Sequence, residues 1–217
     1  MDISGRKTVD LKLKRTICAI CLRPESNCIC PCVTPTFSDV DVLILQHPLE
    51  VHEAKGTARL LHLSLPNSRM VTGEAFDASL FGSPKRSILL YPDTLPDPSM
   101  GLAVPPVLDP SWLSKPAQLR LVVIDGTWRK SRKMLYLNPA LQQMPRLALQ
   151  DLPASRVRRY GIRKAHKADQ LSTLEATCVA LAQLEGDQTK FEPLLAAFDG
   201  FVAQQARFTQ KQAAPLK

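Results

Sequence analysis

Five of the six cysteines in this 217-residue chain lie between Cys18 and Cys32, and this cluster is the strongest local constraint on its fold. Cys18 and Cys21 have C-x-x-C spacing, Cys28 and Cys30 have C-x-C spacing, and Cys32 follows. In both spacings the thiolates can point at one ion from a tight turn, and four sulfurs complete a tetrahedral structural zinc site. The sequence therefore predicts a zinc knuckle on Cys18, Cys21, Cys28 and Cys30, with Cys32 as a spare candidate.

The rest of the chain indicates a reducing compartment for these thiols. Residues 1–15 mix charged and apolar side chains and lack the apolar core of a secretory signal. No stretch is long and apolar enough for a membrane helix, so we expect a cytoplasmic protein in which disulfides are rare. An iron–sulfur cluster also takes four thiolates and stays an alternative, as does a redox pair. Cys178 shares a helical stripe with Leu174 and Leu181, which predicts a buried core cysteine.

After the cysteine cluster, short apolar runs alternate with helical patterns. This alternation predicts an α/β fold, with a mainly parallel sheet covered by helices on both faces. We expect a small zinc knuckle over residues 1–36 and one main domain over residues 37–217. The expected strands are 41–45, 70–72, 87–91, 119–124 and 147–149, and the expected helices are 53–63, 128–137, 174–184 and 192–206.

Three polar segments directly follow expected strands, at residues 46–50, 91–93 and 125–128. In parallel α/β sheets the ligand crevice lies beyond the carboxyl ends of the strands, which makes these segments site candidates. His47, in the first of them, is either a ligand or base, or a loop residue that satisfies backbone groups. The chain has no G-x-G-x-x-G motif and no P-loop, so nothing supports a dinucleotide or nucleoside-triphosphate site.

The segment Asp125-Gly126-Thr127-Trp128 ends the clearest strand and opens a helix. The carboxylate of Asp125 can act as a general base or a hydrogen-bond acceptor, and Gly126 permits close approach of the backbone. Trp128 offers a flat surface on which a purine could stack. The structural alternative is a plain strand-to-helix turn, with Thr127 as N-cap and Trp128 in the core. The residues alone leave both interpretations open.

A second candidate lies at residues 171–176. Ser172 and Glu175 have the spacing of a capping box before an apolar helix. The same geometry presents backbone amides at a helix N-terminus, where the carboxylate of a ligand can bind, and the two interpretations are compatible.

The chain is basic, with a net charge of +8, and its basic residues are clustered. One run, Arg129 to Lys133, follows Trp128 directly, and a second run occupies residues 156–167 around Tyr160. Charge runs are usually solvated faces. Here they flank the candidate site segments, which favours a polyanion such as RNA beside the site. Tyr160 could stack on a base.

Four segments, taken in order, resemble the DTW-domain family. They are Cys18-x-x-Cys21-x-x-Pro24-x-x-x-Cys28-x-Cys30, Gln46-His47-Pro48-x-Glu50, Asp125-x-Thr127-Trp128 and Ser172-Thr173-x-Glu175-Ala176. Within that family the chain most resembles the bacterial tRNA-uridine aminocarboxypropyltransferases. It departs from the pattern after Tyr160, where the sequence is more basic than expected.

The resemblance implies a SPOUT-like α/β catalytic domain with a knotted cofactor region. It implies transfer of the 3-amino-3-carboxypropyl group of S-adenosylmethionine to N3 of a uridine in tRNA, at position 47, with release of 5′-methylthioadenosine. Asp125 is expected to remove the N3 proton or to orient the uracil. The implied residues are Asp125, Thr127 and Trp128 for catalysis; Pro92, Gly126, Trp128, Leu171, Ser172, Thr173 and Glu175 for S-adenosylmethionine; and His47, Glu50, Arg129, Arg132, Arg158, Arg159, Tyr160, Arg163 and Lys164 for tRNA.

Three other functions are compatible with the same residues. They are methyl transfer from S-adenosylmethionine to RNA on the same fold, aminocarboxypropyl transfer to ribosomal RNA, and RNA binding by a non-catalytic zinc-containing module. No obligate protein partner is expected.

Overall fold

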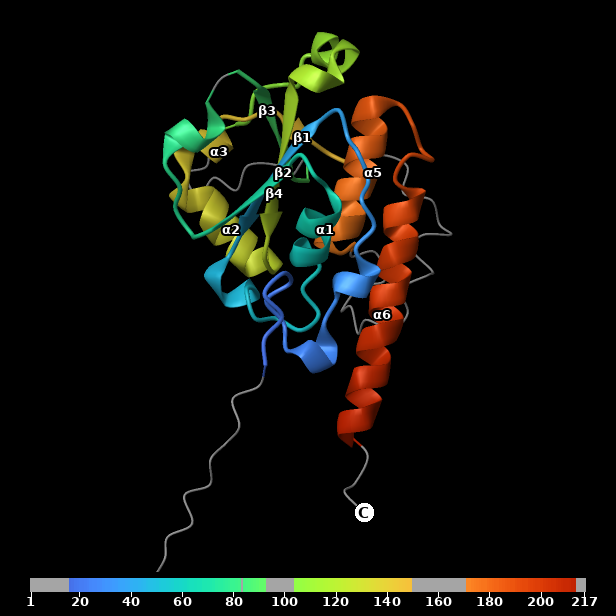
Figure 1. The fold of residues 1–217 in the computed structure, drawn as a ribbon. Coiled ribbons are helices and arrows are strands. Elements are labelled where there is room, and N and C mark those ends of the chain that lie inside the picture. Colours follow the sequence, from blue (N-terminus) through green and yellow to red (C-terminus); the bar gives the residue numbers. More distant parts are fainter. Residues whose placement is uncertain (1–15, 83, 93–103, 150–170, 214–217) are drawn as a thin grey trace, which may run out of the picture.

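A five-stranded parallel sheet forms the centre of the protein in the computed structural model, which describes residues 16–82, 84–92, 104–149 and 171–213 (Figure 1). The strand order is β2-β1-β4-β3-β5, and every neighbouring pair is parallel. The predicted parallel α/β sheet is therefore confirmed. The strands are β1 Asp41–Gln46, β2 Ser68–Thr72, β3 Arg86–Leu90, β4 Leu119–Asp125 and β5 Arg146–Leu147.

Helices cover both faces of the sheet. Figure 1 shows α2 and α3 on one side, and α1, α5 and α6 on the other. Among the described residues no helix is long and apolar enough to cross a membrane. The helices are α1 Ala58–Ser64, α2 Trp128–Leu137, α3 Pro139–Gln142, α5 Thr173–Glu185 and α6 Glu192–Ala213, and short 3-10 helices include Glu25–Asn27, Cys30–Cys32, Pro48–Glu50 and Pro110–Ser114.

The sheet separates two hydrophobic clusters. Because successive side chains of a strand point to opposite faces, Leu121 and Val123 of β4 belong to the cluster of α1, α5 and α6. Val122, between them, belongs to the cluster of α2 and α3 with Met134. Cys178 is fully buried in the first cluster, as predicted.

Two helix boundaries differ from the sequence prediction by more than one residue. The helix expected at residues 53–63 begins only at Ala58. Residues before it form a turn in which the Gly56 amide donates to the Glu53 carbonyl at 2.9 Å, and a Cβ on Gly56 would lie 3.1 Å from that same oxygen. The final helix continues beyond residue 206 to Ala213.

The cysteine segment packs against α6 and shares the core of the sheet. Cys21 and Ile29 are buried in the same hydrophobic cluster as α5 and α6. Gln204 of α6 donates from Nε2 to the Cys28 carbonyl at 2.7 Å, and Asn27 exchanges side-chain hydrogen bonds with Gln205. This segment is therefore fixed to the body of the protein by both apolar and polar contacts.

Shortening Leu121 tests this account of the core. Leu121 is fully buried in the central strand, so Leu121→Ala should lower the free energy of unfolding by about 2–5 kcal/mol through lost burial and a residual cavity. Denaturant unfolding followed by circular dichroism measures the change. Val107→Ala is the control, because Val107 is 91% exposed and its loss should change stability by at most about 0.5 kcal/mol. Equal effects of the two substitutions would contradict the assignment.

Candidate active site and metal centre

The carboxyl edge of the sheet brings the first and third polar segments together. In the register of β1 and β4, Gln46 lies directly opposite Asp125. Both residues share a face with Ile44 and Val123, so both side chains point toward the α5 side of the sheet. Gln46 donates from Nε2 to Asp125 Oδ2 at 3.0 Å, and the His47 amide donates to the Asp125 carbonyl at the same distance.

Asp125 is a buried carboxylate held by two different elements. Its side chain is almost fully buried, and Thr173 at the start of α5 donates from Oγ1 to Asp125 Oδ1 at 2.7 Å. One carboxylate oxygen therefore faces β1 and the other faces α5. A buried carboxylate held at both oxygens has a fixed orientation, which is what a group needs to accept a hydrogen bond or a proton from a ligand at a set position.

The N-terminus of α5 has the predicted capping box. The Glu175 amide donates to Ser172 Oγ at 3.3 Å, and the Ser172 amide donates to Glu175 Oε2 at 2.8 Å. The Leu174 amide is also used inside the chain, because it donates to the buried hydroxyl of Thr57 at 3.2 Å. Thr173 is the first residue of α5, and its hydroxyl is the group at this helix start that reaches Asp125.

His47 points to the opposite face of the sheet, toward α2. Its Nδ1 accepts a hydrogen bond from the Leu49 amide at 3.1 Å, which places the ring proton on Nε2. Nε2 then donates to Glu74 Oε1 at 2.7 Å. Lys133 of α2 contacts the other oxygen of Glu74 at 2.6 Å, and this contact is the main reason that the pKa of Glu74 lies below its usual value. Both ring nitrogens of His47 are thus engaged within the protein.

A second ion pair fixes α2 to the loop after β1. Lys130 donates from Nζ to Glu50 Oε1 at 2.8 Å, and both side chains are largely buried. The chain turns tightly between the end of β4 and the start of α2. A Cβ on Gly126, in this turn, would lie 3.2 Å from the Cβ of Lys130. Gly126 is therefore the residue that lets α2 begin so close to the strand end.

The structural alternative for this segment is right for Thr127 and wrong for Trp128. Thr127 is the N-cap of α2, and its hydroxyl accepts from the Lys130 amide at 3.5 Å. Trp128 is 51% exposed, so its placement in the core is wrong. Its ring meets Tyr91 edge to face with centroids 6.1 Å apart, and the guanidinium of Arg146 lies over the Tyr91 ring. Trp128 therefore offers one open aromatic surface beside the carboxyl ends of β3 and β4.

The structure describes the first basic run but not the second. Arg129 and Arg132 are exposed residues of α2, the helix that Trp128 begins. The second run lies outside the described residues, and with it the candidate tRNA contacts Arg158, Arg159, Tyr160, Arg163 and Lys164.

Two residues expected to contact S-adenosylmethionine, Pro92 and Leu171, are partly buried, and each lies next to a site segment.

The four predicted zinc ligands come together in space. The ligand atoms of Cys18, Cys21, Cys28 and Cys30 all lie within 4.8 Å of one another. The Sγ atoms of Cys18 and Cys30 are 3.6 Å apart, and those of Cys21 and Cys28 are 3.7 Å apart. A tetrahedral zinc ion with Zn–S bonds of about 2.3 Å needs sulfurs about 3.8 Å apart, so the cluster fits that ion. The backbone amides of Cys21 and Ile20 lower the pKa of Cys18 from 9.0 to about 6, whereas burial and the neighbouring thiols raise the pKa of Cys30 to about 12.

Cys32 lies outside this four-sulfur cluster. Its thiol donates to Gln204 Oε1 at 3.4 Å, and burial raises its pKa. Cys32 therefore fixes the knuckle to α6, and the choice of the first four cysteines as the ligand set agrees with the geometry.

Sequence reasoning missed three residues that hold the site. Gln46 was part of a motif but had no assigned role, although it contacts Asp125 directly. Thr57 and Glu74 were not singled out, and both act on residues far away in the sequence. The polar end of an otherwise apolar strand was a usable signal for Gln46. Nothing in the local sequence marks Thr57 or Glu74.

Comparison with known proteins identifies the family. A family model described as the DTW domain matches residues 15–206, which is most of the chain. The chain belongs to the DTW domain family. The resemblance carried by the ordered cysteine, QHP, DTW and ST motifs is therefore confirmed. No solved structure matches the chain.

Three relatives of this DTW domain protein are named tRNA-uridine aminocarboxypropyltransferase 2. It is 31% identical to tRNA-uridine aminocarboxypropyltransferase 2 of Drosophila melanogaster, over 89% of the chain and 78% of the relative. It is 29% identical to the protein of that name from Macaca fascicularis and 31% identical to the one from Mus musculus, in both cases over 84% of the chain and 61% of the relative. The chain thus spans about three fifths of the length of these two mammalian proteins.

Replacing one ligand of the cysteine cluster tests the metal assignment. Cys21→Ser should reduce zinc, measured by mass spectrometry of the purified protein, from one equivalent to a small fraction. It should also lower the midpoint of thermal unfolding by on the order of 10 °C, because metal binding contributes to folding. Cys32→Ser is the matched control and should keep its zinc. Full zinc content in the Cys21 variant would show that the cluster does not hold the ion.

Proposed function

We propose that this protein transfers the 3-amino-3-carboxypropyl group of S-adenosylmethionine to N3 of a uridine in tRNA, with position 47 as the target. The observation that carries the proposal is the buried Asp125 carboxylate, held by Gln46 and Thr173 at the carboxyl edge of the sheet. The names of the relatives supply the reaction, since each is called a tRNA-uridine aminocarboxypropyltransferase. The site supplies a group suited to uridine N3.

In this proposal Asp125 is the general base that takes the proton of uridine N3. S-adenosylmethionine supplies an aminocarboxypropyl group on a sulfonium, which is a good leaving group. Uridine N3 carries a weakly acidic proton, and the Asp125 carboxylate accepts a hydrogen bond from N3–H and takes that proton as N3 attacks. The new N–C bond forms as the C–S bond breaks, and the electron pair stays on the sulfur of 5′-methylthioadenosine. Positioning of the two reactants by this site contributes most of the rate gain.

Residues around Asp125 suit the adenosine and amino-acid parts of the donor. The open face of Trp128 can stack on adenine, with Pro92 and Gly126 beside it at neighbouring strand ends. Thr173 offers its amide to a carboxylate, and Leu171 lies next to it along the chain. Ser172 and Glu175 act indirectly in this proposal, because their polar groups form the capping box that shapes the helix start.

The tRNA-binding proposal rests on charge and exposure. The chain carries a net charge of +8, and Arg129 and Arg132 are exposed in the first turns of α2, the helix that Trp128 begins. Phosphates of a folded RNA would meet these side chains while the uridine enters the site. The second basic run, residues 156–167, is the other proposed contact and lies outside the described residues.

The proposal also covers the fold of the catalytic domain and the role of the metal. A SPOUT-like arrangement with a knotted cofactor region is part of the proposal, and the parallel five-stranded sheet supports its α/β part. Residues 1–36 are proposed as the zinc knuckle and residues 37–217 as the catalytic domain. Zinc bound by four cysteines has no open coordination position, so its role is structural.

Nucleoside mass spectrometry tests the reaction itself. Purified protein incubated with tRNA and S-adenosylmethionine should convert a uridine to its aminocarboxypropyl derivative and release 5′-methylthioadenosine in equal amount. A methyltransferase of the same fold would instead add a methyl group and release S-adenosylhomocysteine. Ribosomal RNA tested in parallel separates the two RNA substrates. An unchanged uridine profile in both RNAs would overturn the proposal and favour a binding module.

Replacing Asp125 tests its role as base. Asp125→Asn keeps the size of the side chain, and Gln46 can turn its amide to keep a hydrogen bond. We expect transfer to fall by about 10²–10⁴-fold, as for loss of a general base, with little change in the affinity for S-adenosylmethionine measured by calorimetry. Asp109→Asn is the control, because Asp109 is exposed and caps a 3-10 helix at the other end of the sheet. Full transfer by the Asp125 variant would exclude the base role.

A further inference from the structure

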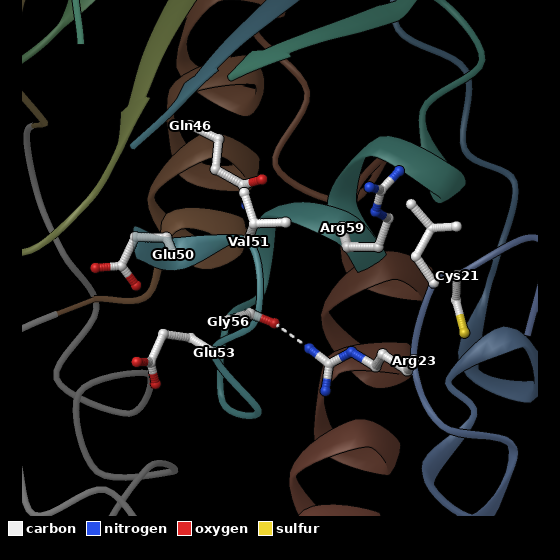
Figure 2. A pocket seen from close by; sticks show the side chains of 9 residues that line it. Cys21, Arg23, Gln46, Glu50, Val51, Glu53, Gly56 and Arg59 are labelled. Carbon is white, nitrogen blue, oxygen red and sulfur yellow. Dashed lines mark hydrogen bonds between the residues drawn. The ribbon is translucent and has the colours of Figure 1, made fainter. Parts of the chain in front are cut away.

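Arg23 connects the cysteine cluster to the loop that follows β1. Its Nη1 donates to the Ala54 carbonyl at 2.5 Å, and its Nη2 donates to the Gly56 carbonyl at 2.8 Å. Figure 2 shows the guanidinium reaching across from the knuckle to Gly56, with Glu50 and Glu53 on the same loop. Two parallel hydrogen bonds from one planar cation fix the distance and the direction of this loop.

The knuckle side of this connection is rigid. Arg23 lies two residues after Cys21, which is buried in the core, and its guanidinium also packs 5.2 Å from the centre of the Phe201 ring in α6. The pocket beside it has a volume of only about 20 Å³, about the space of one water molecule. Arg23 therefore joins the knuckle, α6 and the loop. The pocket beside it is too small for a substrate.

The loop side of the connection leads to the proposed active site in short steps. Gly56 directly precedes Thr57, whose buried hydroxyl accepts the Leu174 amide at 3.2 Å. Leu174 follows Thr173, which donates to Asp125 at 2.7 Å. A shift of the loop would therefore move the hydroxyl that holds the start of α5, and with it the contact of Thr173 with the carboxylate.

We propose that Arg23 is a positioning residue, which uses the metal-stabilised knuckle to set the start of α5 and hence the orientation of Asp125. This inference rests on the proposed function where it concerns catalysis. It assigns the knuckle a second effect besides folding, because the same residues that hold the ion would set the geometry of a site on the sheet edge. In this role Arg23 does not contact the substrate.

The test compares Arg23→Gln and Arg23→Lys with the control Arg59→Gln. Arg59 lines the same pocket, and its side chain, unlike that of Arg23, does not hydrogen-bond the Ala54 or Gly56 carbonyl. Gln cannot donate to both carbonyls, whereas Lys keeps the charge and one of the two contacts. Zinc content, measured for each protein, should equal that of the wild type because the four ligands are unchanged.

Two readouts should then move together in Arg23→Gln. Hydrogen exchange should speed up at residues 54–57 and at the Leu174 amide, while the centre of the sheet exchanges as in the wild type. The kcat for transfer should fall on the order of tenfold, the effect of about one lost charge-assisted hydrogen bond, with the KM for tRNA little changed. Arg23→Lys should recover part of both effects, and Arg59→Gln should match the wild type.

Exchange at Leu174 and kcat both at wild-type levels in Arg23→Gln would overturn the inference. So would a loss of zinc, or a uniform rise in exchange over the whole protein, because either would mean that Arg23 only stabilises the fold. The exchange readout needs neither RNA nor S-adenosylmethionine. If the wild type transfers nothing, the proposed function fails, and exchange at Leu174 still decides whether Arg23 sets the start of α5.

Discussion

The hydrogen bonds that Gln46 and Thr173 donate to the Asp125 carboxylate join the parts of the protein on which the site depends. Gln46 approaches one oxygen from β1, and Thr173 approaches the other from α5. The three residues come from separate parts of the chain, and only the parallel pairing of β1 with β4 and the packing of α5 on that face bring them together. A carboxylate buried in this way is costly unless its oxygens are satisfied, so the same contacts that stabilise the strand ends also fix the direction in which the group can act.

The alternation of side chains at the end of β1 divides the surroundings of the site into two sides. Gln46 points toward α5 and the carboxylate, whereas His47, one residue later, points toward α2. On that second side His47 and Lys133 share the carboxylate of Glu74, and the pair of Lys130 with Glu50 adds a further contact. These contacts hold the helix that begins with Trp128, so the aromatic surface and the carboxylate are positioned by separate networks on opposite faces of one sheet edge.

Much of this could be predicted from the sequence where the signal is local. The apolar run of β4, the capping box of Ser172 and Glu175, and the paired cysteines are short patterns with one dominant structural solution. The start of α1 could not be placed, because the turn around Gly56 depends on the loop that Arg23 holds. The contact of Thr57 with Leu174 joins residues 117 positions apart, and its existence follows from packing that no local pattern encodes. The family resemblance added the reaction and the substrate, which the residue types alone did not specify.

The most direct test of the central claim is a double-mutant cycle on Asp125 and Thr173, with kcat/KM for uridine modification as the measured quantity. Thr173→Val removes a hydrogen bond that orients the carboxylate, and Asp125→Asn removes the carboxylate itself, so the second substitution should add little once the first is present. The account predicts a coupling free energy of about 1 kcal/mol or more between the two positions. Losses that add to within about 0.3–0.5 kcal/mol would contradict it, because they would mean that Thr173 does not act through the Asp125 carboxylate.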